Sequence, residues 1–285
     1  VYKRQYMYGY SHLFVWEEVN MKQFTNIEKA CLFVIGFYLC IAIISIFWTP
    51  YDPTVVDIYH AFETPSWNHW LGTDSLGRDV VSRLMVSAEI SIFFCIITAA
   101  LTMTLGLILG VVGGYYKGRV DFAIQSLVNI FQGIPGYAFM IALAGILEPS
   151  LYSVIIAVVI TSWTSFSQVV RSEVLSITSR EYVAGAKVLG ASNIYIIFRY
   201  ILPLLLPLIL VLLSIRISTT VLMVSGLSFI GLGLQPPMTD WGTMIQEGQT
   251  YFRTYPILLY APGLCILTFC GALNYIGESY KKQLV

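Results

Sequence analysis

Arg216 is the residue best placed to do chemistry, because it is a cation inside an otherwise uncharged apolar stretch. An arginine in a bilayer is costly, and it usually faces a bundle interior or a water-filled cavity. There its guanidinium can bind and pass an anionic group such as a carboxylate. The alternatives are an ion pair or carbonyl contact with a neighbouring helix or subunit, or a side chain that extends to the membrane surface. The sequence leaves these interpretations open.

Polar residues also interrupt the apolar stretch 122–147. Gln125, Asn129 and Gln132 follow one another at helical intervals, so a helix would place them on one face. They either line a path through the membrane with Arg216 or hydrogen-bond to adjacent helices. The run Gly-Ile-Pro-Gly around Pro135 then predicts a kink, since proline lacks the N–H that a helix interior needs. Because such a kink can turn backbone groups toward a cavity, Pro135 joins the candidate lining of that path.

A third group of polar residues lies in the segment WLGTDSLGRDVVSR, at positions 70–83. Gly72 and Gly77 permit tight turns. The charged side chains can pair with one another or face a partner, and the usual role of such a cluster is a solvated structural loop. These charged residues are Asp74, Arg78, Asp79 and Arg83.

The usual catalytic and metal-binding patterns are not found in this sequence. The five cysteines lie in apolar stretches without CxxC spacing, and the three histidines are isolated from one another. A GxxxxGK[ST] phosphate-binding loop is also missing. We therefore expect no catalytic residue, no metal site and no cofactor bound by this chain.

The composition indicates the elements that must position these residues. Apolar residues make up 57% of the 285 residues and charged residues 11%, against about 25% charge in a soluble domain. This excludes an ordinary soluble domain and a disordered chain. A net charge of zero gives no basic field for nucleic acid, so membrane lipid is the expected surrounding.

Six apolar stretches are long enough to cross a bilayer as helices, each near the roughly 20 residues that this requires. We therefore predict an all-α integral membrane protein with six transmembrane helices. The stretches are 30–48, 90–112, 122–147, 151–170, 200–225 and 256–277.

The basic residues predict the orientation. With the N-terminus inside, most lysines and arginines lie on the inner side, and Arg78, Arg83 and Arg253 are the outer ones. The positive-inside rule then places both termini in the cytoplasm. The outer segments run from 49 to 89 and from 226 to 255.

Three regions follow from this topology. Residues 1–29 form an N-terminal cytoplasmic tail, residues 30–89 form the first span with its outer loop, and residues 90–285 form a five-helix core. The first 20 residues are aromatic and patternless, and Met21 follows them. Our hypothesis is that residues 1–20 are not native and that Met21 is the natural start.

The inner segment 171–199 between the fourth and fifth spans, here named the coupling loop, carries the strongest pattern. Ser179 predicts an N-cap for one helix, the run from Gly190 predicts a break, and Ser192 predicts a second N-cap. Pro203 then lies at the entry of the next span, where its missing N–H costs little. Small side chains let another protein's backbone approach closely, with charged residues beside them. The residues concerned are Glu181, Ala184, Gly185, Ala186 and Lys187.

The loop resembles the EAA loop of membrane subunits of ABC importers: Glu-Ala-Ala, three residues, Gly, nine residues, then Ile-x-Leu-Pro. The spacing to Gly190, Leu202 and Pro203 is kept. Glu181, one helical turn earlier, is our candidate for the acidic contact. Three positions differ from the pattern: Ala184, Gly185 and Tyr200.

Two outer blocks, 70–83 (preceded by Tyr-Asp-Pro at 51–53) and 227–242, are similar to the C-type permease of peptide and nickel ABC importers. The resemblance implies a type I ABC importer permease fold in a bacterial or archaeal cytoplasmic membrane. It also implies a homologous B-type permease, two ATPase subunits that hold ATP and Mg, and an extracytoplasmic substrate-binding protein. The substrates implied are peptides, nickel or metal chelates, of which we favour peptides.

A secondary transporter or channel subunit is the alternative. Such a protein would need ion-coupling acids or a filter in the membrane. The six predicted spans hold no aspartate or glutamate in their cores, and no internal repeat is visible. An ATP-driven importer therefore remains the favoured function.

Overall fold

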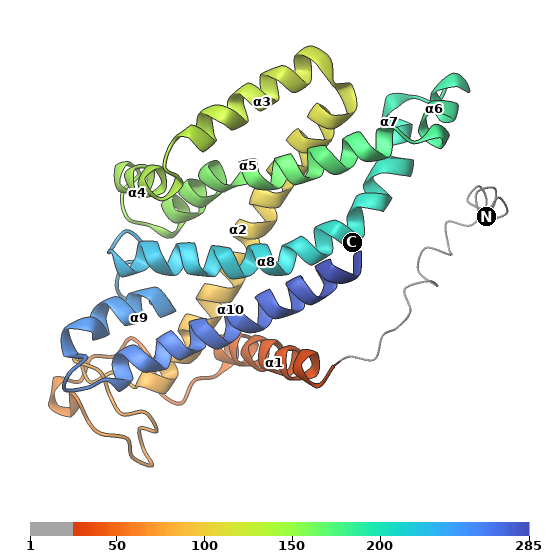
Figure 1. Ribbon diagram of the computed structural model, residues 1–285. Helices are drawn as coiled ribbons and strands as arrows, with labels where there is room; N and C mark the ends of the chain where they lie inside the picture. Colours follow the sequence, from red (N-terminus) through yellow and green to blue (C-terminus); the bar gives the residue numbers. More distant parts are fainter. Residues whose placement is uncertain (1–24, 285) are drawn as a thin grey trace.

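The computed structural model describes residues 25–284. The regular secondary structure of this part of the chain is helical, with one isolated β-bridge between Thr73 and Asp79 (Figure 1). The hypothesis on residues 1–20 lies outside the described residues. The long helices are α1 (Asn26–Phe47), α2 (Val80–Tyr116), α3 (Gly118–Gly133), α4 (Gly136–Ile146), α5 (Leu151–Thr178), α8 (Leu202–Phe229) and α10 (Ile257–Leu284). The short ones are η2 (Ile58–His60), α6 (Glu181–Val188), α7 (Asn193–Ile196), η3 (Ile197–Ile201), α9 (Trp241–Gly248) and η4 (Gln249–Tyr251).

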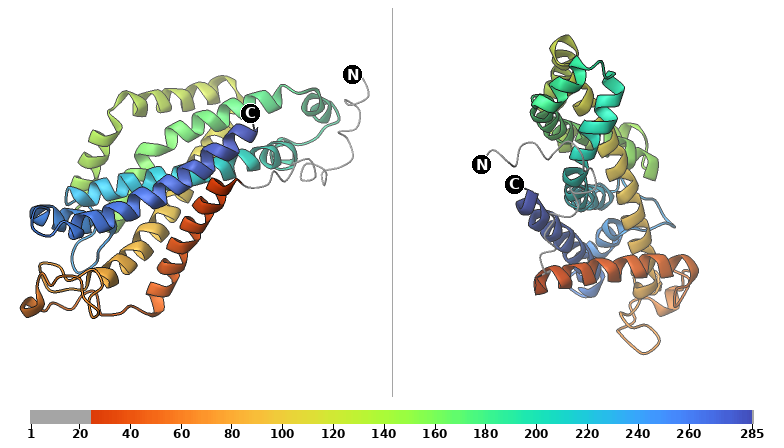
Figure 2. Two further views of the ribbon diagram at one scale, coloured as in Figure 1. Left: turned by 60° about the horizontal axis from the view of Figure 1, so that its bottom comes forward. Right: turned by 90° about the vertical axis from the view of Figure 1, so that its right-hand side faces the viewer.

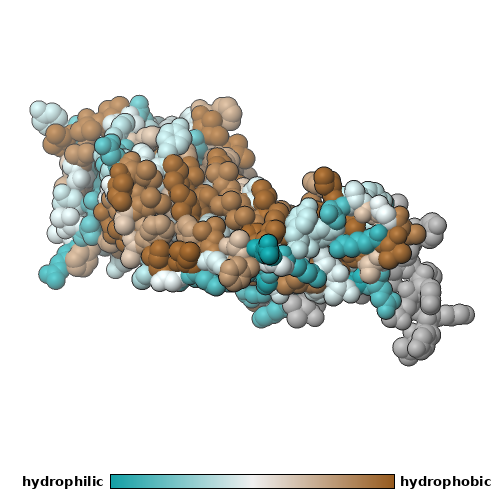
Figure 3. All heavy atoms as spheres, turned by 90° about the horizontal axis from the view of Figure 1, so that it is seen from above, coloured by the Kyte–Doolittle hydropathy of each residue, from teal (hydrophilic) through white to brown (hydrophobic). Residues whose placement is uncertain are grey.

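The six predicted apolar stretches all coincide with helices. Five helices of the described part are long and apolar enough to cross a membrane, and the pair α3 and α4 makes a sixth if it counts as one bent span. The start of α1, the end of α10 and helices α6 and α7 lie at one end of the molecule (Figure 2). The loop before α2 and helix α9 lie at the other end. On the face drawn in Figure 3, hydrophobic residues gather over the middle and hydrophilic ones toward the ends.

Helix α2 is longer than the apolar stretch that predicted it. It has 37 residues, or about 55 Å at 1.5 Å per residue, against about 30 Å of hydrocarbon. Arg83 and Glu89, placed in the outer loop by the sequence, therefore belong to this helix. Asp79 sets its start, because its carboxylate accepts the N–H of Ser82 at 2.7 Å. At the other end Lys117 alone separates α2 from α3, so the helices fill most of the gap between the predicted stretches 90–112 and 122–147.

The N-cap predicted at Ser179 is also wrong. Helix α5 continues to Thr178, and the Ser179 hydroxyl donates back to the Ser176 carbonyl at 2.7 Å. Helix α6 starts at Glu181 without a side-chain cap. Residues 171–178 of the coupling loop are therefore the continuation of α5 beyond the length that a bilayer needs.

The third span is broken at the predicted kink. Helices α3 and α4 meet at an angle of 86°. Ile134 is extended there, as a residue before proline prefers, and Pro135 occupies the N-cap position of α4. At the start of α3, Asp121 is held to α5 by two bonds of 2.5 Å from the Arg171 guanidinium. The start of the third span is therefore bound to α5, and the span bends at Pro135.

Helices α2 and α5 pack through backbone contact. Gly106, Gly110 and Gly114 recur every four residues and so form one face of α2. A Cβ on each would come within 2.9, 2.6 and 2.9 Å of backbone carbonyl oxygens in α5. These carbonyls belong to Trp163, Ser167 and Arg171. Glycine is therefore required along this face, as in other tightly packed membrane helices.

An aromatic cluster closes the outer half of the bundle. Trp241 at the start of α9 is fully buried, and its ring meets those of Tyr38 and Phe269 edge to face at 5.6 and 6.0 Å. Trp241 is therefore a packing group of the bundle interior. Asp240 caps α9 by accepting the N–H of Thr243 at 2.6 Å.

Candidate functional site

The coupling loop folds as a helix, a glycine turn and a second helix. Gly190 has φ of +84°, the left-handed conformation that suits glycine. Its N–H donates to the Lys187 carbonyl and that of Ala191 to the Ala186 carbonyl, both at 3.0 Å. This pair of bonds is the Schellman motif that ends many helices. Ser192 then caps α7, because its hydroxyl accepts the N–H of Tyr195 at 3.2 Å. The predicted break and second N-cap are confirmed.

The small residues of the loop do not all face outward. Ala184 and Gly185 are exposed, as is Glu181, and a Cβ on Gly185 would meet nothing within 4 Å. Ala186 is buried and packs in the cluster that includes Val183. The expectation that Ala186 offers a contact surface is therefore wrong, because it lies on the face of α6 that packs on α5.

Apolar side chains surround the glycine turn at the tip of the loop, and we name them the apolar tip. Val188 and Leu189 are each 88% exposed. Exposed apolar patches of this kind mark sites of protein interaction when they lie outside the hydrocarbon. This patch was not predicted from the sequence, although Val-Leu directly before a turn glycine was a visible signal. The remaining members are Tyr182, Ile194, Tyr195 and Phe198.

The loop leads into α8 through an unbroken helix. The stretch Asn193–Phe229 is one candidate span, and within it the residues of η3 form a π-helical turn. The Leu202 N–H reaches back five residues to the Ile197 carbonyl. Pro203 is the second residue of α8, as the sequence predicted, although the helical residues of α7 and η3 precede it. The wide turn accommodates the proline, whose ring conflicts with regular helical bonding.

The candidate path residues belong to α3, to the N-cap of α4 and to α8. Gln132 of α3 exchanges two hydrogen bonds with Gln168 of α5, at 3.1 and 3.4 Å. Asn129 and Pro135 are exposed. Helix α5 lies between α3 and α8 (Figure 1), so the structure does not bring these residues to Arg216.

Arg216 is half-buried in α8. Among residues 25–284 its guanidinium has no ion-pair or hydrogen-bond partner. Helix α8 packs on α10, α2, α9 and α5. Within the described part of the chain, this cation therefore lies in the membrane with its charge uncompensated.

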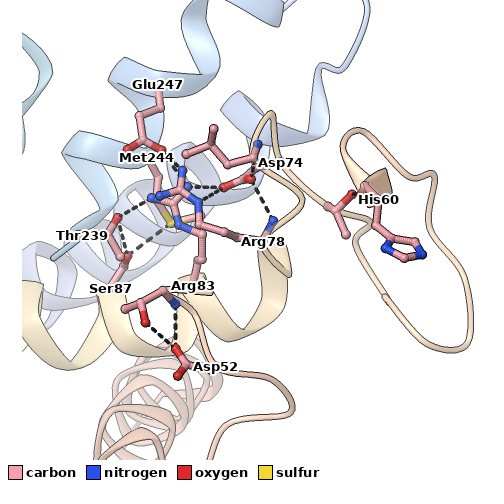
Figure 4. A network of polar contacts seen from close by, with 12 residues as sticks. Asp52, His60, Asp74, Arg78, Arg83, Ser87, Thr239, Met244 and Glu247 are labelled. Carbon is pink, nitrogen blue, oxygen red and sulfur yellow. Dashed lines mark hydrogen bonds and ion pairs between the residues drawn. The ribbon is translucent and has the colours of Figure 1, made fainter. Parts of the chain in front are cut away.

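The charged residues of the outer loop form a buried network with α9 (Figure 4). The Asp74 carboxylate accepts from Arg78 Nε at 2.7 Å and from Arg83 Nη1 at 2.6 Å. Glu247 of α9 accepts from the same two guanidinium groups at 2.8 and 2.7 Å. Asp74, Arg78 and Arg83 are each at most 6% exposed. We name these four residues the outer ion network. Glu247 was not predicted from the sequence, because no local pattern links it to a loop more than 160 residues away.

The rest of this loop is held by its own turns. Gly72 and Gly77 have φ of +77° and +74°, and a Cβ on either would clash with a carbonyl oxygen at 2.2 or 1.8 Å. Asp79 caps α2 and also contacts His69 Nδ1 at 2.9 Å. The loop is thus a rigid platform fastened to α2 and α9. Within residues 25–284, no three histidine, cysteine, aspartate or glutamate side chains converge as a metal site would require.

The chain matches a known protein family over residues 103–279, described as "Binding-protein-dependent transport system inner membrane component". It is 34% identical to the nickel transport system permease protein NikC of Escherichia coli (strain K12) over 256 residues, which cover 90% of this chain and 92% of that protein. It is 32% identical over 275 residues to the oligopeptide transport system permease protein OppC of Bacillus subtilis (strain 168), with coverage of 95% and 90%.

A third relative is the glutathione transport system permease protein GsiD of Pectobacterium atrosepticum, 34% identical over 254 residues that cover 87% of this chain and 84% of that protein. Among solved structures, a chain of the MetNI methionine ABC transporter in inward-facing conformations matches with a TM-score of 0.56 and 14% identity. The match covers 68% of this chain and 93% of that chain, and it supports the fold. The chain therefore belongs to the inner membrane components of binding-protein-dependent transport systems, as an ABC importer permease of the peptide and nickel family.

Proposed function

We propose that this chain is the C-type permease of a peptide importer and that its coupling loop docks an ATPase subunit. In the proposed complex it pairs with a homologous B-type permease, two ATPase subunits and an extracytoplasmic binding protein, in a bacterial or archaeal cytoplasmic membrane with both termini inside. The observation that carries the proposal is the apolar tip. It is exposed at the end of the molecule where α1 starts and α10 ends.

The loop suits a mechanical role. ATP and Mg are held by the ATPase subunits, whose closure on ATP moves the docked loop. The short helices α6 and α7 are fixed to each other by the Gly190 turn, and α7 continues into α8. A movement of the tip therefore reaches a membrane helix directly and biases it between inward-open and outward-open states.

The docking role predicts that Leu189→Asp weakens ATPase binding to the permease complex by at least tenfold. An aspartate here would have to bury an unpaired carboxylate in the interface, and a tenfold loss corresponds to about 1.4 kcal/mol. Co-purification of the ATPase subunits with the detergent-solubilised complex measures the effect. Ile58→Asp is the matched control, because Ile58 is 70% exposed at the opposite end. Equal ATPase recovery for both variants would contradict the docking role.

The polar face of α3 supports pairing with a second membrane subunit. Asn129 is exposed on this face, and the nearby Gln132 is exposed but is hydrogen-bonded to Gln168 of α5, so of these two amides the unpartnered one within residues 25–284 is that of Asn129. Amide groups that face lipid have no hydrogen-bond partners. We therefore propose that this face looks onto the B-type permease or the path between the two subunits, while the exposed apolar surface of α1 faces lipid.

Short peptides are the substrate class that we propose. Two of the three relatives are named for oligopeptides and glutathione, and a carboxylate suits the uncompensated Arg216. The test uses the complete complex in proteoliposomes, with the binding protein loaded from a short-peptide mixture or from a nickel chelate. We expect the peptide mixture to stimulate ATP hydrolysis and uptake. Stimulation by the nickel chelate alone would replace peptides with a metal chelate as the substrate.

Arg216 is proposed to help the substrate carboxylate through the membrane. Arg216→Gln is expected to lower peptide uptake about tenfold, the value of one charge-assisted hydrogen bond, with assembly and basal ATP hydrolysis unchanged. Arg216→Lys keeps the charge and should recover part of the uptake. Peptides with an amidated C-terminus should be less affected by Arg216→Gln. Normal uptake by Arg216→Gln in a normally assembled complex would exclude this role.

A further inference from the structure

Tyr115 links the coupling loop to a second membrane helix. It lies in the last turn of α2, and its side chain is 5% exposed. The Lys187 ammonium stands 4.7 Å from the centre of its ring, within the range of a cation–π contact. The Tyr115 hydroxyl donates to Asn193 Oδ1 at 2.8 Å. One side chain of α2 therefore holds both short helices of the loop, one on each side of the Gly190 turn.

The position of Tyr115 is fixed by its surroundings. It belongs to a buried cluster that joins α2 to the inner end of α5 and to the start of the α8 helix. Its neighbours in that cluster include Val111, Val174, Val183 and Ile196. A buried ring in such a cluster cannot change rotamer without disturbing its neighbours. Movement of Lys187 or Asn193 must therefore be transmitted to α2 through this ring.

Lys187 makes a contact that its position in the sequence does not indicate. The sequence placed it on the loop surface beside the small residues. In the structure its ammonium is directed at Tyr115 of its own chain, and within residues 25–284 it has no carboxylate partner. Lys187 and Asn193 are exposed on the loop and each also contacts Tyr115, whereas the apolar tip forms the apolar part of the loop surface.

Helix α2 can carry a movement to the far side of the membrane. Its 37 residues run without interruption from the outer end to Tyr115. The glycine face fastens its inner half to α5. At the outer end Arg83 is bound to Glu247 and Asp74. A displacement at Tyr115 therefore reaches the outer ion network through one rigid helix and a buried ion pair.

We propose that Tyr115 is the positioning residue through which the coupling loop drives α2 and, at its far end, the outer loop and α9. This inference rests on the proposed docking of an ATPase at the loop. The path through α2 is additional to the direct connection into α8. The path through α2 connects the outer loop with the ATPase. The outer loop is the surface available to a binding protein.

Tyr115→Phe tests the link with the smallest change. It removes the hydroxyl bond to Asn193 and keeps the ring, so the cluster and the cation–π contact remain. The complete complex in proteoliposomes is supplied with ATP and with binding protein loaded from a short-peptide mixture, or from a nickel chelate where that supports wild-type uptake. We expect unchanged assembly and basal ATP hydrolysis. The stimulation of ATP hydrolysis by the loaded binding protein should fall about fivefold, the value of one hydrogen bond. The uptake per ATP hydrolysed should fall by the same factor.

Two further substitutions separate coupling from folding. Asn193→Ala removes the same bond from the exposed side of the loop, so it should give the same loss, and the double variant should lose no more than either single variant. Lys187→Met removes the charge over the ring and should lower the coupling as well. Tyr116→Phe is the control, because Tyr116 is 49% exposed and, among residues 25–284, its hydroxyl has no hydrogen-bond partner.

The outcomes distinguish this inference from the proposed function. Wild-type uptake per ATP in the Tyr115→Phe and Asn193→Ala variants, in an assembled complex, would overturn the role of Tyr115 and leave docking intact. Failure of the wild-type chain to bind any ATPase would overturn docking and this inference together. A drop confined to thermal stability, with normal coupling, would show that the contacts are merely structural and would also overturn the proposal.

Discussion

Replacing Asp74 with asparagine is expected to destabilise the outer half of the molecule by about 3–5 kcal/mol, the cost of leaving buried charges without their partner. Asp74 is 4% exposed, and its carboxylate accepts from two guanidinium groups and from the N–H groups of Leu76 and Arg78. Asparagine has nearly the same shape but presents an N–H₂ group toward one of these donors. Thermal unfolding of the purified chain in detergent, followed by tryptophan fluorescence, measures the loss.

The same substitution at Asp52 provides the control. Asp52 lies in the same loop but is exposed, and its carboxylate is bound locally by Thr54 at 2.6 and 2.8 Å. Asp52→Asn should change the unfolding temperature little, because exposed polar interactions contribute little to stability. Similar unfolding temperatures for the two variants would show that the outer ion network does not stabilise the loop.

Gly110→Ala is expected to disrupt the contact between α2 and α5. The added Cβ would lie 2.6 Å from the Ser167 carbonyl oxygen and 2.8 Å from the Val170 Cβ. Neither neighbour is the far end of a flexible side chain, so the two helices must separate along their whole glycine face. Overpacking alone costs about 1–3 kcal/mol, and the lost backbone contact adds to this. Yield of monodisperse protein in detergent and the unfolding temperature report the effect.

Gly36→Ala is the matched control for Gly110→Ala. Gly36 also lies inside a membrane helix, α1, but a Cβ there would meet nothing within 4 Å. Alanine favours a helix by about 1 kcal/mol over glycine, so this variant should be as stable as the parent or slightly more so. Comparable yields for Gly110→Ala and Gly36→Ala would refute tight backbone packing at Gly110.

Hydropathy predicted the spans well because each is a run of apolar residues of bilayer length. It could not predict where helices continue into water. The first turns of α2 and the last turns of α5 contain polar residues. The N-cap at Asp79 and the bond from Ser179 to Ser176 join side chains to the backbone, which hydropathy does not report. The glycine face was visible as a repeat of Gly every four residues from Gly106, a pattern that the sequence analysis did not use.

The candidate site was predicted in part. The helix, turn and helix of the coupling loop follow from Gly190 and Ser192, whose conformational and capping preferences are local. The partners of Tyr115 and Glu247 could not be predicted, because they depend on contacts between distant segments. Arg216 stays a prediction as a path residue.

The π-helical turn of η3 determines the direction in which the coupling loop points. Ile196, Ile201 and Leu205 are all fully buried, yet residues five apart in a regular α-helix would point about 140° away from each other. The extra residue absorbed by the turn brings Ile196 and Ile201 onto one side. Loss of a single residue here would leave both flanking helices intact but rotate the loop by about 100° around the axis of α8. The direction in which the loop points around the axis of α8 is therefore set by the number of residues in one turn. It does not depend on the residues that form the loop surface.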